Sequence, residues 1–248
     1  MNFTDLLISP NVKRIYNNHF DNLRSSIPDC SLQYHTIDSK QVIVIKIHDK
    51  DHLSDLQDEY HTWYKQFQKD GLLEDVSITG VKENMNDGQG STRYSTNSSH
   101  LSTYLTKIIN SFDLDLYDYH QDLLHKFNKV SYYFRFMKYK SGGQHYPHYD
   151  SDYSDRKRVT KYSLVMYFND CDDGELVFCK DSRENHHNSD WDRQCTEDEI
   201  LFKIKPQKGL IVLFPHTLCH SVLPFTGEER NMVRGDLEFR NIWQESQK

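Results

Sequence analysis

The spacing of apolar residues in the first half of the chain predicts both strands and a helix. Residues 41–47, QVIVIKI, are β-branched and lie between polar clusters, which predicts a strand. From Asp51 to Phe67 apolar residues recur at spacings of three and four, as on one face of an α-helix. Asp51 can cap that helix and Gly71 can end it. Residues 74–79 predict another strand.

The segments around this region have weaker patterns. Loosely helical spacing from Val12 to Phe20 predicts a short helix. Residues 83–99 are rich in Asn, Ser, Gly and Asp and poor in apolar residues, which predicts a loop. Apolar repeats over residues 101–109 and 119–127 then predict two helices that buttress a sheet.

From Ser131 onward the apolar pattern has a period of two, which is typical of strands. Further strands are predicted over residues 160–169, 209–214 and 230–243. In the last of these, Arg230 and Arg234 fall on the same face, so that face is strongly cationic. The second half of the chain is therefore predicted to be mainly β.

Composition limits the kinds of function that the chain can have. The 248 residues include 30 basic and 37 acidic ones, and the formal net charge of −7 argues against a nucleic-acid partner held by charge alone. The start of the chain lacks the features of a signal peptide, and no apolar run is long enough to span a membrane. We therefore expect a cytoplasmic or nuclear protein without a membrane partner.

His148 and Asp150 form the strongest local chemical signal. They are two residues apart, so on a strand both can point to one site. One imidazole and one carboxylate cannot complete a tetrahedral zinc site. With a further histidine, however, they would form the facial triad of non-heme iron(II) oxygenases, which leaves coordination positions open. His145, His216 and His220 are the histidines to consider.

The motifs around this pair occur in a characteristic order. They are Tyr139, Gly142-Gly143-Gln144, Pro147-His148-Tyr149-Asp150, Tyr167-Phe168-Asn169, Gly174-Glu175-Leu176-Val177-Phe178, Gly209, His220, Arg230 and Arg234-Gly235-Asp236. This order resembles the 2-oxoglutarate- and iron(II)-dependent dioxygenases, most closely the prolyl 4-hydroxylase branch, over roughly residues 130–243. Two details differ from the family pattern: Arg230 stands where collagen-type members carry a lysine, and Gly227 falls one position early.

The resemblance implies a metal site made of three catalytic residues. His148, Asp150 and His220 are the expected ligands of Fe(II). His220 is preferred over His216 because its distance from Arg230 matches the family, whereas His216 occupies a variable position.

The resemblance also implies a binding site for 2-oxoglutarate. The far carboxylate of this dianion needs a buried cation with planar, bidentate donors, and Arg230 meets that need. Tyr139 and Tyr167 are expected to donate hydrogen bonds to it, and we add Ser163 and Arg234 to the candidate 2-oxoglutarate site. O2 is the second co-substrate, and ascorbate is an optional reductant.

The fold that this resemblance implies is a double-stranded β-helix, or jelly-roll barrel. The expected class is mainly β with flanking helices (α+β), with the N-terminal helices packed on one sheet. Residues 130–248 would form the dioxygenase core, and residues 1–129 a support region of the same domain.

The implied reaction hydroxylates a substrate carbon while 2-oxoglutarate is converted to succinate and CO2. A protein or peptide, and specifically a prolyl residue, is the expected substrate. An AlkB-type nucleic-acid demethylase stays an alternative because Arg234-x-Asp236-x-x-x-Arg240 is similar to the tail motif of that group. A small-molecule hydroxylase and an inactive binding barrel also stay open as functions. Whether the polar segments 83–99, 151–158 and 180–199 are surface loops or substrate lids is left open.

Overall fold

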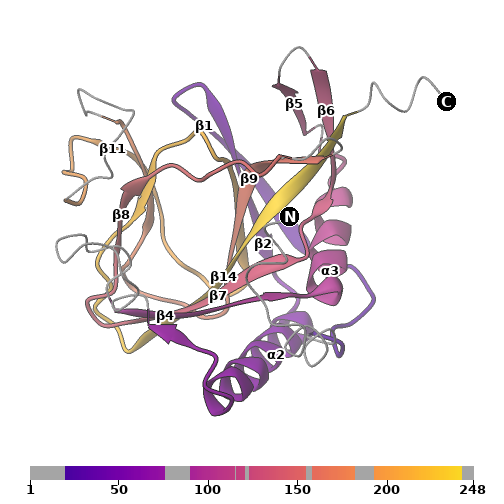
Figure 1. Cartoon of the computed structure of the whole chain (residues 1–248), viewed down its shortest axis with the longest axis vertical. Coiled ribbons are helices and arrows are strands. Elements are labelled where there is room, and N and C mark those ends of the chain that lie inside the picture. The colour runs from indigo at the N-terminus through magenta and orange to yellow at the C-terminus, as the bar shows by residue number, and fades with distance from the viewer. Residues whose placement is uncertain are drawn as a thin grey trace.

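The computed structural model describes residues 20–75, 90–114, 116–120, 123–154, 158–181 and 193–241 (Figure 1). Within these residues the chain forms two α-helices and two antiparallel β-sheets. No helix in this part of the chain has the length and apolar character needed to cross a membrane.

The elements follow one another in an order dominated by strands. The helices are α2 (Lys50–Lys69) and α3 (Ser99–Asn110). The strands are β1 (Cys30–Ile37), β2 (Lys40–Ile47), β3 (Glu74–Asp75), β4 (Ser91–Asn97), β5 (Tyr117–His120), β6 (Leu123–Val130), β7 (Tyr133–Lys140), β8 (His145–His148), β9 (Arg158–Tyr167), β10 (Leu176–Cys179), β11 (Ile200–Ile204), β12 (Leu210–Pro215), β13 (His220–Val222) and β14 (Glu229–Asn241).

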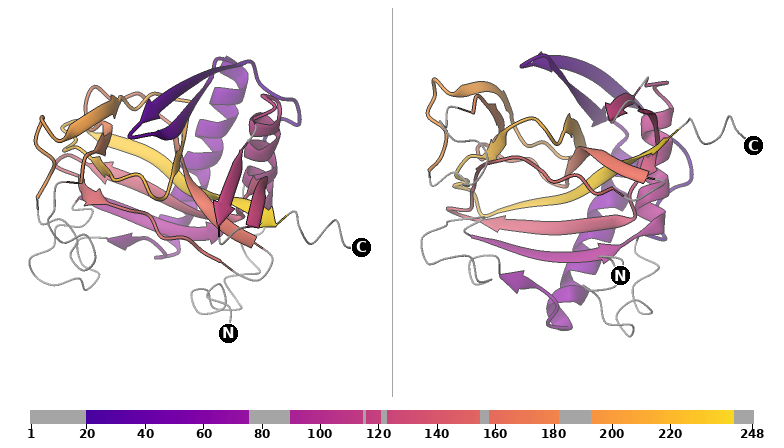
Figure 2. Two further views of the ribbon diagram at one scale, coloured as in Figure 1. Left: turned by 90° about the horizontal axis from the view of Figure 1, so that it is seen from above. Right: turned by 45° about the horizontal axis from the view of Figure 1, so that its top comes forward.

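The two sheets face each other, and the helices lie on the outer side of the larger one (Figures 1 and 2). The ten-stranded sheet runs β1-β2-β12-β9-β14-β7-β4-β3, with β6 also paired to β14 and β5 to β6. The four-stranded sheet runs β11-β10-β13-β8, so β8 is an edge strand.

Strand β2 illustrates how the larger sheet is buried on both faces. Ile43 and Ile45 pack in one apolar cluster with residues of α2 and α3, such as Tyr60. Val42 and Val44 point the opposite way and pack in a second cluster that includes residues of the small sheet. Side chains therefore alternate between two apolar cores along this strand, and the second core is packed between the two sheets.

Helix α2 confirms the predicted amphipathic helix but begins at a different cap. The side chain of Asp49 accepts hydrogen bonds from the backbone N–H groups of Asp51 and His52, at 3.0 and 3.2 Å. The prediction of Asp51 as the cap is therefore wrong, because Asp51 already lies in the first turn. Gly71, with a φ of +66°, follows the end of the helix as predicted.

Helix α3 confirms the helix predicted over residues 101–109. The helix predicted over residues 119–127 is wrong, because this segment forms the hairpin of β5 and β6. Strand β7 pairs with β14 only as far as Arg234, and β6 pairs with the next part of β14, up to Asn241. This segment forms strands because the open edge of the long strand β14 is available to pair with β6. Local apolar spacing cannot reveal that edge.

The loop predicted over residues 83–99 is wrong for its second part. Residues 91–97 form β4, which pairs with β7 along its whole length, while residues 83–89 lie outside the described residues. Small polar side chains form a strand here because β7 supplies the hydrogen-bonding edge. Strands β1 and β11 were also not predicted, and of the short helix predicted over residues 12–20 only Phe20 is described.

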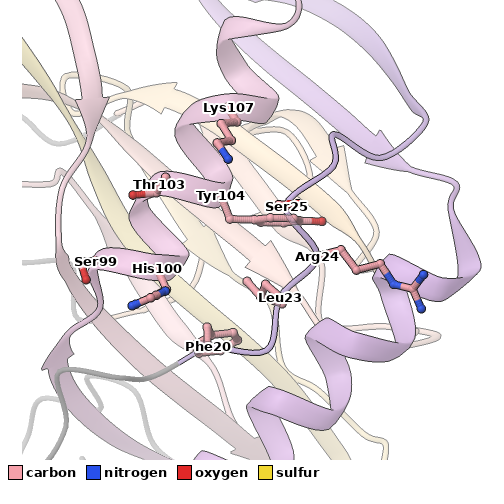
Figure 3. Close-up of a pocket in the computed structure, with 9 residues that line it drawn as sticks. All are labelled: Phe20, Leu23, Arg24, Ser25, Ser99, His100, Thr103, Tyr104 and Lys107. Atoms are coloured by element: carbon pink, nitrogen blue, oxygen red, sulfur yellow. The ribbon is translucent and has the colours of Figure 1, made fainter.

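A cavity of about 310 Å³ lies where α3 meets the segment that precedes β1 (Figure 3). Tyr104 and Lys107 of α3 line it, together with Phe20 and Arg24. Helix α3, which lines this cavity, lies on the opposite side of the molecule from the small sheet (Figure 1). Arg24 pairs with Asp55 at 2.7 Å, so the charge of this arginine is already compensated.

Candidate active site

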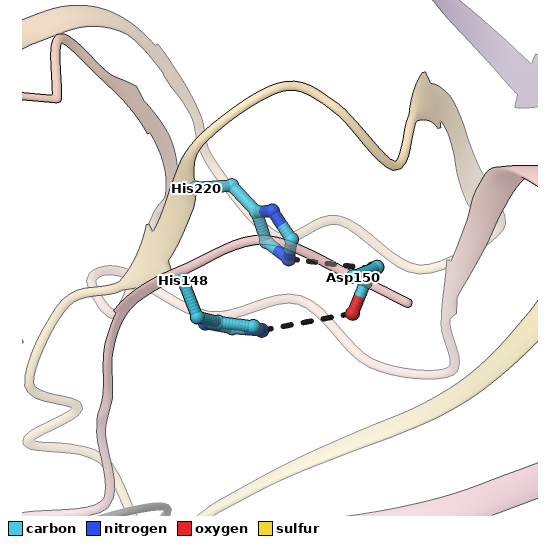
Figure 4. A group of neighbouring side chains, drawn as sticks. All are labelled: His148, Asp150 and His220. Carbon is cyan, nitrogen blue, oxygen red and sulfur yellow. Dashed lines mark ion pairs between the residues drawn. The ribbon is translucent and has the colours of Figure 1, made fainter. Parts of the chain in front are cut away.

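The pairing of β8 with β13 brings two histidines together in the small sheet. His148 and His220 are direct partners across these antiparallel strands, and their ring centroids are 4.3 Å apart (Figure 4). Asp150 lies beside both rings, and one potential ligand atom from each of the three residues falls within 4.8 Å of the others. Because β8 ends at His148, the prediction that strand alternation orients Asp150 is wrong, and other contacts must hold this carboxylate.

Hydrogen bonds to backbone carbonyls orient both imidazoles. Nδ1 of His148 lies 2.8 Å from the carbonyl oxygen of Tyr146, and Nδ1 of His220 lies 3.0 Å from that of Leu218. A carbonyl oxygen only accepts, so in each ring Nδ1 carries the hydrogen and donates it. The Nε2 lone pairs are left to face Asp150, at 3.7 and 3.5 Å, which is the arrangement of two metal-binding histidines.

Asp150 is held by residues of the larger sheet. Ser163 of β9 donates a hydrogen bond to Oδ2, and Nη2 of Arg234 lies 2.8 Å from Oδ1. Burial would raise the pKa of this carboxyl group, but the net effect of its surroundings, which include the guanidinium of Arg234 and the hydroxyl of Ser163, lowers it. Asp150 is therefore a carboxylate at neutral pH.

The protonation states of these groups suit a divalent metal. Burial, together with neighbouring His148, lowers the pKa of His220 to about 3, so its imidazole is neutral at physiological pH. Two imidazoles and one carboxylate form the ligand set of the facial triad, which suits iron(II) and leaves positions open. The three residues thus fit the metal that the sequence motifs implied.

A buried arginine forms the second part of the site. Arg230 has no exposed surface, and its guanidinium carbon lies 4.1 Å from the ring centroid of Tyr139 and 5.7 Å from that of Phe225. Nη1 donates a hydrogen bond to the carbonyl oxygen of Gly174. Within the described residues, Nε and Nη2 have no hydrogen-bond partner. Such a buried cation is costly unless an anion compensates it.

Two tyrosines stand next to this arginine. Tyr139 of β7 is the cross-strand partner of Arg230, and Tyr167 of β9 is the partner of Met232 on the other side of β14. Burial raises the pKa of both phenols, and Arg230 only partly opposes this effect. Both hydroxyls therefore keep their protons at neutral pH and can donate hydrogen bonds to an anion.

The eight predicted site residues fall into two groups in the structure. Five lie at the candidate metal site: the three potential ligands, and two residues that contact Asp150. They are His148, Asp150 and His220, with Ser163 and Arg234. The other three surround the buried guanidinium: they are Arg230, Tyr139 and Tyr167. That Ser163 and Arg234 bind 2-oxoglutarate stays a prediction, since the contacts observed are to Asp150.

Sequence reasoning missed several residues that complete these groups. His216 was set aside, yet it is buried and lies between Asp152 and Asp236, at 2.9 and 3.3 Å. Alternation along β14 places Asp236 on the same face as Arg234, and this was the one signal in the sequence for the contacts of Asp236. The position of Phe225 over Arg230 had no local signal, because its loop is brought there by the tertiary fold.

Comparison with protein families supports the chemistry that this geometry suggests. Residues 134–235 match the family described as the 2OG-Fe(II) oxygenase superfamily, and this segment contains His148, Asp150, His220 and Arg230. The resemblance inferred from the motifs is thereby confirmed. It supports an oxidoreductase of the dioxygenase class, with iron as cofactor and 2-oxoglutarate as co-substrate. No curated protein matches the sequence.

Three solved structures are similar to this chain at low sequence identity. A prolyl hydroxylase from Trichoplax adhaerens, in complex with a hypoxia inducible factor oxygen degradation domain peptide fragment, is similar with a TM-score of 0.50 and 12% identity, over 96% of this chain and 94% of that one. A Pseudomonas putida prolyl-4-hydroxylase gives a TM-score of 0.44 at 18% identity, over 91% of this chain and 98% of that one. HygX from Streptomyces hygroscopicus, with nickel, 2-oxoglutarate and hygromycin B bound, gives 0.46 at 11% identity, over 83% and 84%.

Proposed function

We propose that this protein is an Fe(II)- and 2-oxoglutarate-dependent hydroxylase whose iron ligands are His148, Asp150 and His220. The observation that carries the proposal is the environment of Arg230: its guanidinium is buried, and Nε and Nη2 lack hydrogen-bond partners within the described residues. The far carboxylate of 2-oxoglutarate would supply the missing charge and acceptors. Tyr139 and Tyr167 would complete the contacts to that carboxylate.

The residues of the site divide the work of catalysis between them. His148 and His220 offer their Nε2 atoms to the metal because their Nδ1 atoms are fixed on backbone carbonyls. The apolar cluster between the sheets, which includes Phe178 and Phe214, keeps water away from the buried end of the co-substrate. With O2, iron and 2-oxoglutarate supply the oxidising power for hydroxylation, yielding succinate and CO2. No side chain has to act as a general base.

A protein or peptide is the substrate class that we propose, with a prolyl residue as the hydroxylated group. Two tyrosines flank Asp150 in the chain, Tyr149 and Tyr153, and each is 41% exposed. Exposed aromatic side chains suit the rigid ring of proline, as in other proline-binding surfaces. The Trichoplax adhaerens hydroxylase of similar fold was solved with a peptide bound. The segment that carries both tyrosines would lie along such a peptide.

The proposed fold of this enzyme is the jelly-roll barrel expected from the sequence. Its support comes from the two facing antiparallel sheets and from the helices packed on the outside of the larger one. We propose residues 130–248 as the catalytic core and residues 1–129 as a support region of the same domain. The proposed location is the cytoplasm or the nucleus.

Incubation of the purified protein with Fe(II), 2-oxoglutarate, ascorbate and proline-bearing peptides tests this function. The expected result is release of succinate together with a gain of one oxygen in the mass of the peptide. His148→Ala should show neither product, and tandem mass spectrometry should locate the oxygen on a prolyl residue.

Different substrates would redirect the proposal. Succinate release stimulated by a methylated oligonucleotide would favour an AlkB-type demethylase, and stimulation by a free amino acid or another small molecule would favour a small-molecule hydroxylase. Absence of 2-oxoglutarate binding by the folded protein would favour an inactive barrel.

A further inference from the structure

A row of alternating charges leads away from the candidate metal ligand Asp150. Nη2 of Arg234 lies 2.8 Å from Oδ1 of Asp150 and 3.4 Å from Oδ1 of Asp236. The same Asp236 oxygen lies 3.3 Å from Nε2 of His216. Arg234 therefore stands between two carboxylates, one of which belongs to the metal site.

The row continues to the segment that follows Asp150 in the chain. Nδ1 of His216 lies 2.9 Å from Oδ1 of Asp152, and Asp152 also forms an ion pair with Lys161. The backbone N–H of His216 donates to the carbonyl oxygen of Lys161 at 2.9 Å, which fixes the histidine beside β9. Acidic and basic groups thus alternate from Asp150 to Lys161.

This arrangement fixes the position of Arg234 more strongly than a single ion pair would. His216 is only 1% exposed, and its two ring nitrogens face two carboxylates. Burial would lower the pKa of His216, but Asp236, Asp150 and Asp152 outweigh burial and raise it. Through Nε2, His216 lies against Asp236, and Asp236 in turn helps to keep the guanidinium of Arg234 directed toward Asp150.

The environment of Arg234 also differs from that of an arginine waiting for a ligand. Nη2 of Arg234 already faces two carboxylates, and within the described residues its Nε lacks a hydrogen-bond partner, whereas in Arg230 both Nε and Nη2 lack one. Carboxylates that bind metals commonly depend on such outer hydrogen bonds for their orientation.

We propose that Arg234 is a positioning residue that holds Asp150 for metal binding, and that Asp236, His216 and Asp152 support it through this row of charges. The inference rests on the proposed metal site. It goes beyond that site because it makes the affinity for metal depend on residues that do not contact the metal. It also assigns Arg234 to the metal rather than to 2-oxoglutarate.

Binding of Mn(II) to the apoprotein, followed by electron paramagnetic resonance, tests the inference without turnover. Arg234→Met should raise the Kd for Mn(II) about 10- to 100-fold, the range typical of lost outer contacts to a metal ligand. Arg234→Lys should recover part of the affinity, since it keeps the charge. His216→Asn should raise the Kd by a smaller factor. Binding of 2-oxoglutarate at saturating Mn(II), followed by calorimetry, should change less than about threefold in all three variants, well below the metal effect.

A second buried histidine provides the matched control. His52 of α2 is 3% exposed and hydrogen-bonded to Tyr104 and Ser26, but it lies outside the row of charges. His52→Asn should lower the urea midpoint of unfolding and leave the Kd for Mn(II) unchanged.

Three results would overturn the inference. An unchanged Kd for Mn(II) in folded Arg234→Met would do so, as would a larger effect of that variant on 2-oxoglutarate than on metal. Absence of Mn(II) binding by the wild-type protein would overturn the proposed metal site as well, so the two failures are distinguishable.

Discussion

The two arginines of β14 differ in their surroundings although they share a strand and a face. Arg230 is stacked on the ring of Tyr139, and within the described residues two of its guanidinium nitrogens have no hydrogen-bond partner. Arg234, four residues on and about 13 Å away along the strand, lies against the carboxylates of Asp150 and Asp236. One arginine is prepared for an anion, and the other already holds one.

This difference shows how one strand can serve both halves of a site. A buried cation without a counterion costs free energy in the empty protein, which a dianionic ligand can recover on binding. A buried cation that already faces two carboxylates instead holds side chains of the protein itself in place. The side-chain type is the same, so the neighbouring strands decide the role.

The largest effect should come from removing one of the three proposed metal ligands. His148→Ala leaves two of the three, so turnover measured as succinate release should fall below detection. His220→Ala should behave in the same way. His216→Ala should retain measurable turnover, because His216 contacts Asp152 and Asp236 rather than Asp150. Equal loss of turnover in His216→Ala and His220→Ala would show that the third ligand is wrongly chosen.

The next effect separates the two arginines directly. Loss of one partner of a buried charge pair costs about 3–5 kcal/mol, so Arg230→Ala should raise the 2-oxoglutarate concentration needed for half-maximal rate roughly a hundredfold or more. Arg234→Ala should change this concentration far less at saturating iron. If Arg234→Ala has the larger effect on 2-oxoglutarate, the roles of the two residues are reversed.

A smaller effect is expected from Gly174, whose carbonyl accepts the hydrogen bond of Arg230. A Cβ at this position would lie 2.6 Å from Nη1 of Arg230, and the backbone has a φ of +73°. Gly174→Ala should lower the free energy of unfolding by about 1–3 kcal/mol and also weaken 2-oxoglutarate binding, measured by calorimetry. Gly71→Ala is the matched control, because Gly71 has a φ of +66° with nothing within 4 Å of its Cβ. Equal 2-oxoglutarate affinity in the two variants would contradict the proposed role of Arg230.

The smallest effect concerns the pH dependence of stability that comes from His216, one of the residues that support Arg234. The pKa of His216 is raised in the folded protein by Asp236, Asp150 and Asp152 despite burial. Its contribution to stability is therefore fully present below the unfolded value of about 6.5 and is lost as pH rises through the folded pKa. Urea unfolding should show a fall in stability across this interval that is shallower in His216→Asn. Identical pH dependence in both proteins would mean that His216 is not protonated in the native state.

The sequence predicted the chemistry of the site better than its supporting structure. Period-two spacing placed Arg230 and Arg234 on one face of β14, and the geometry of that strand follows from side-chain alternation alone. The pair His148 and Asp150 was likewise visible, since its members are close together in the chain. By contrast, the hairpin of β5 and β6 was taken for a helix, because its pairing with β14 depends on a strand more than a hundred residues later.

The sequence by itself therefore determined the residue types of the metal site, the order of the motifs and the alternation that gives β14 one cationic face. Only the tertiary structure decided how these parts meet. The pairing of β8 with β13 sets His148 beside His220, and the approach of the small sheet to β14 places Asp150 against Arg234. The physical reason is that alternation and local spacing act within one strand, whereas the compensation of a buried charge depends on whichever distant strand packs over it.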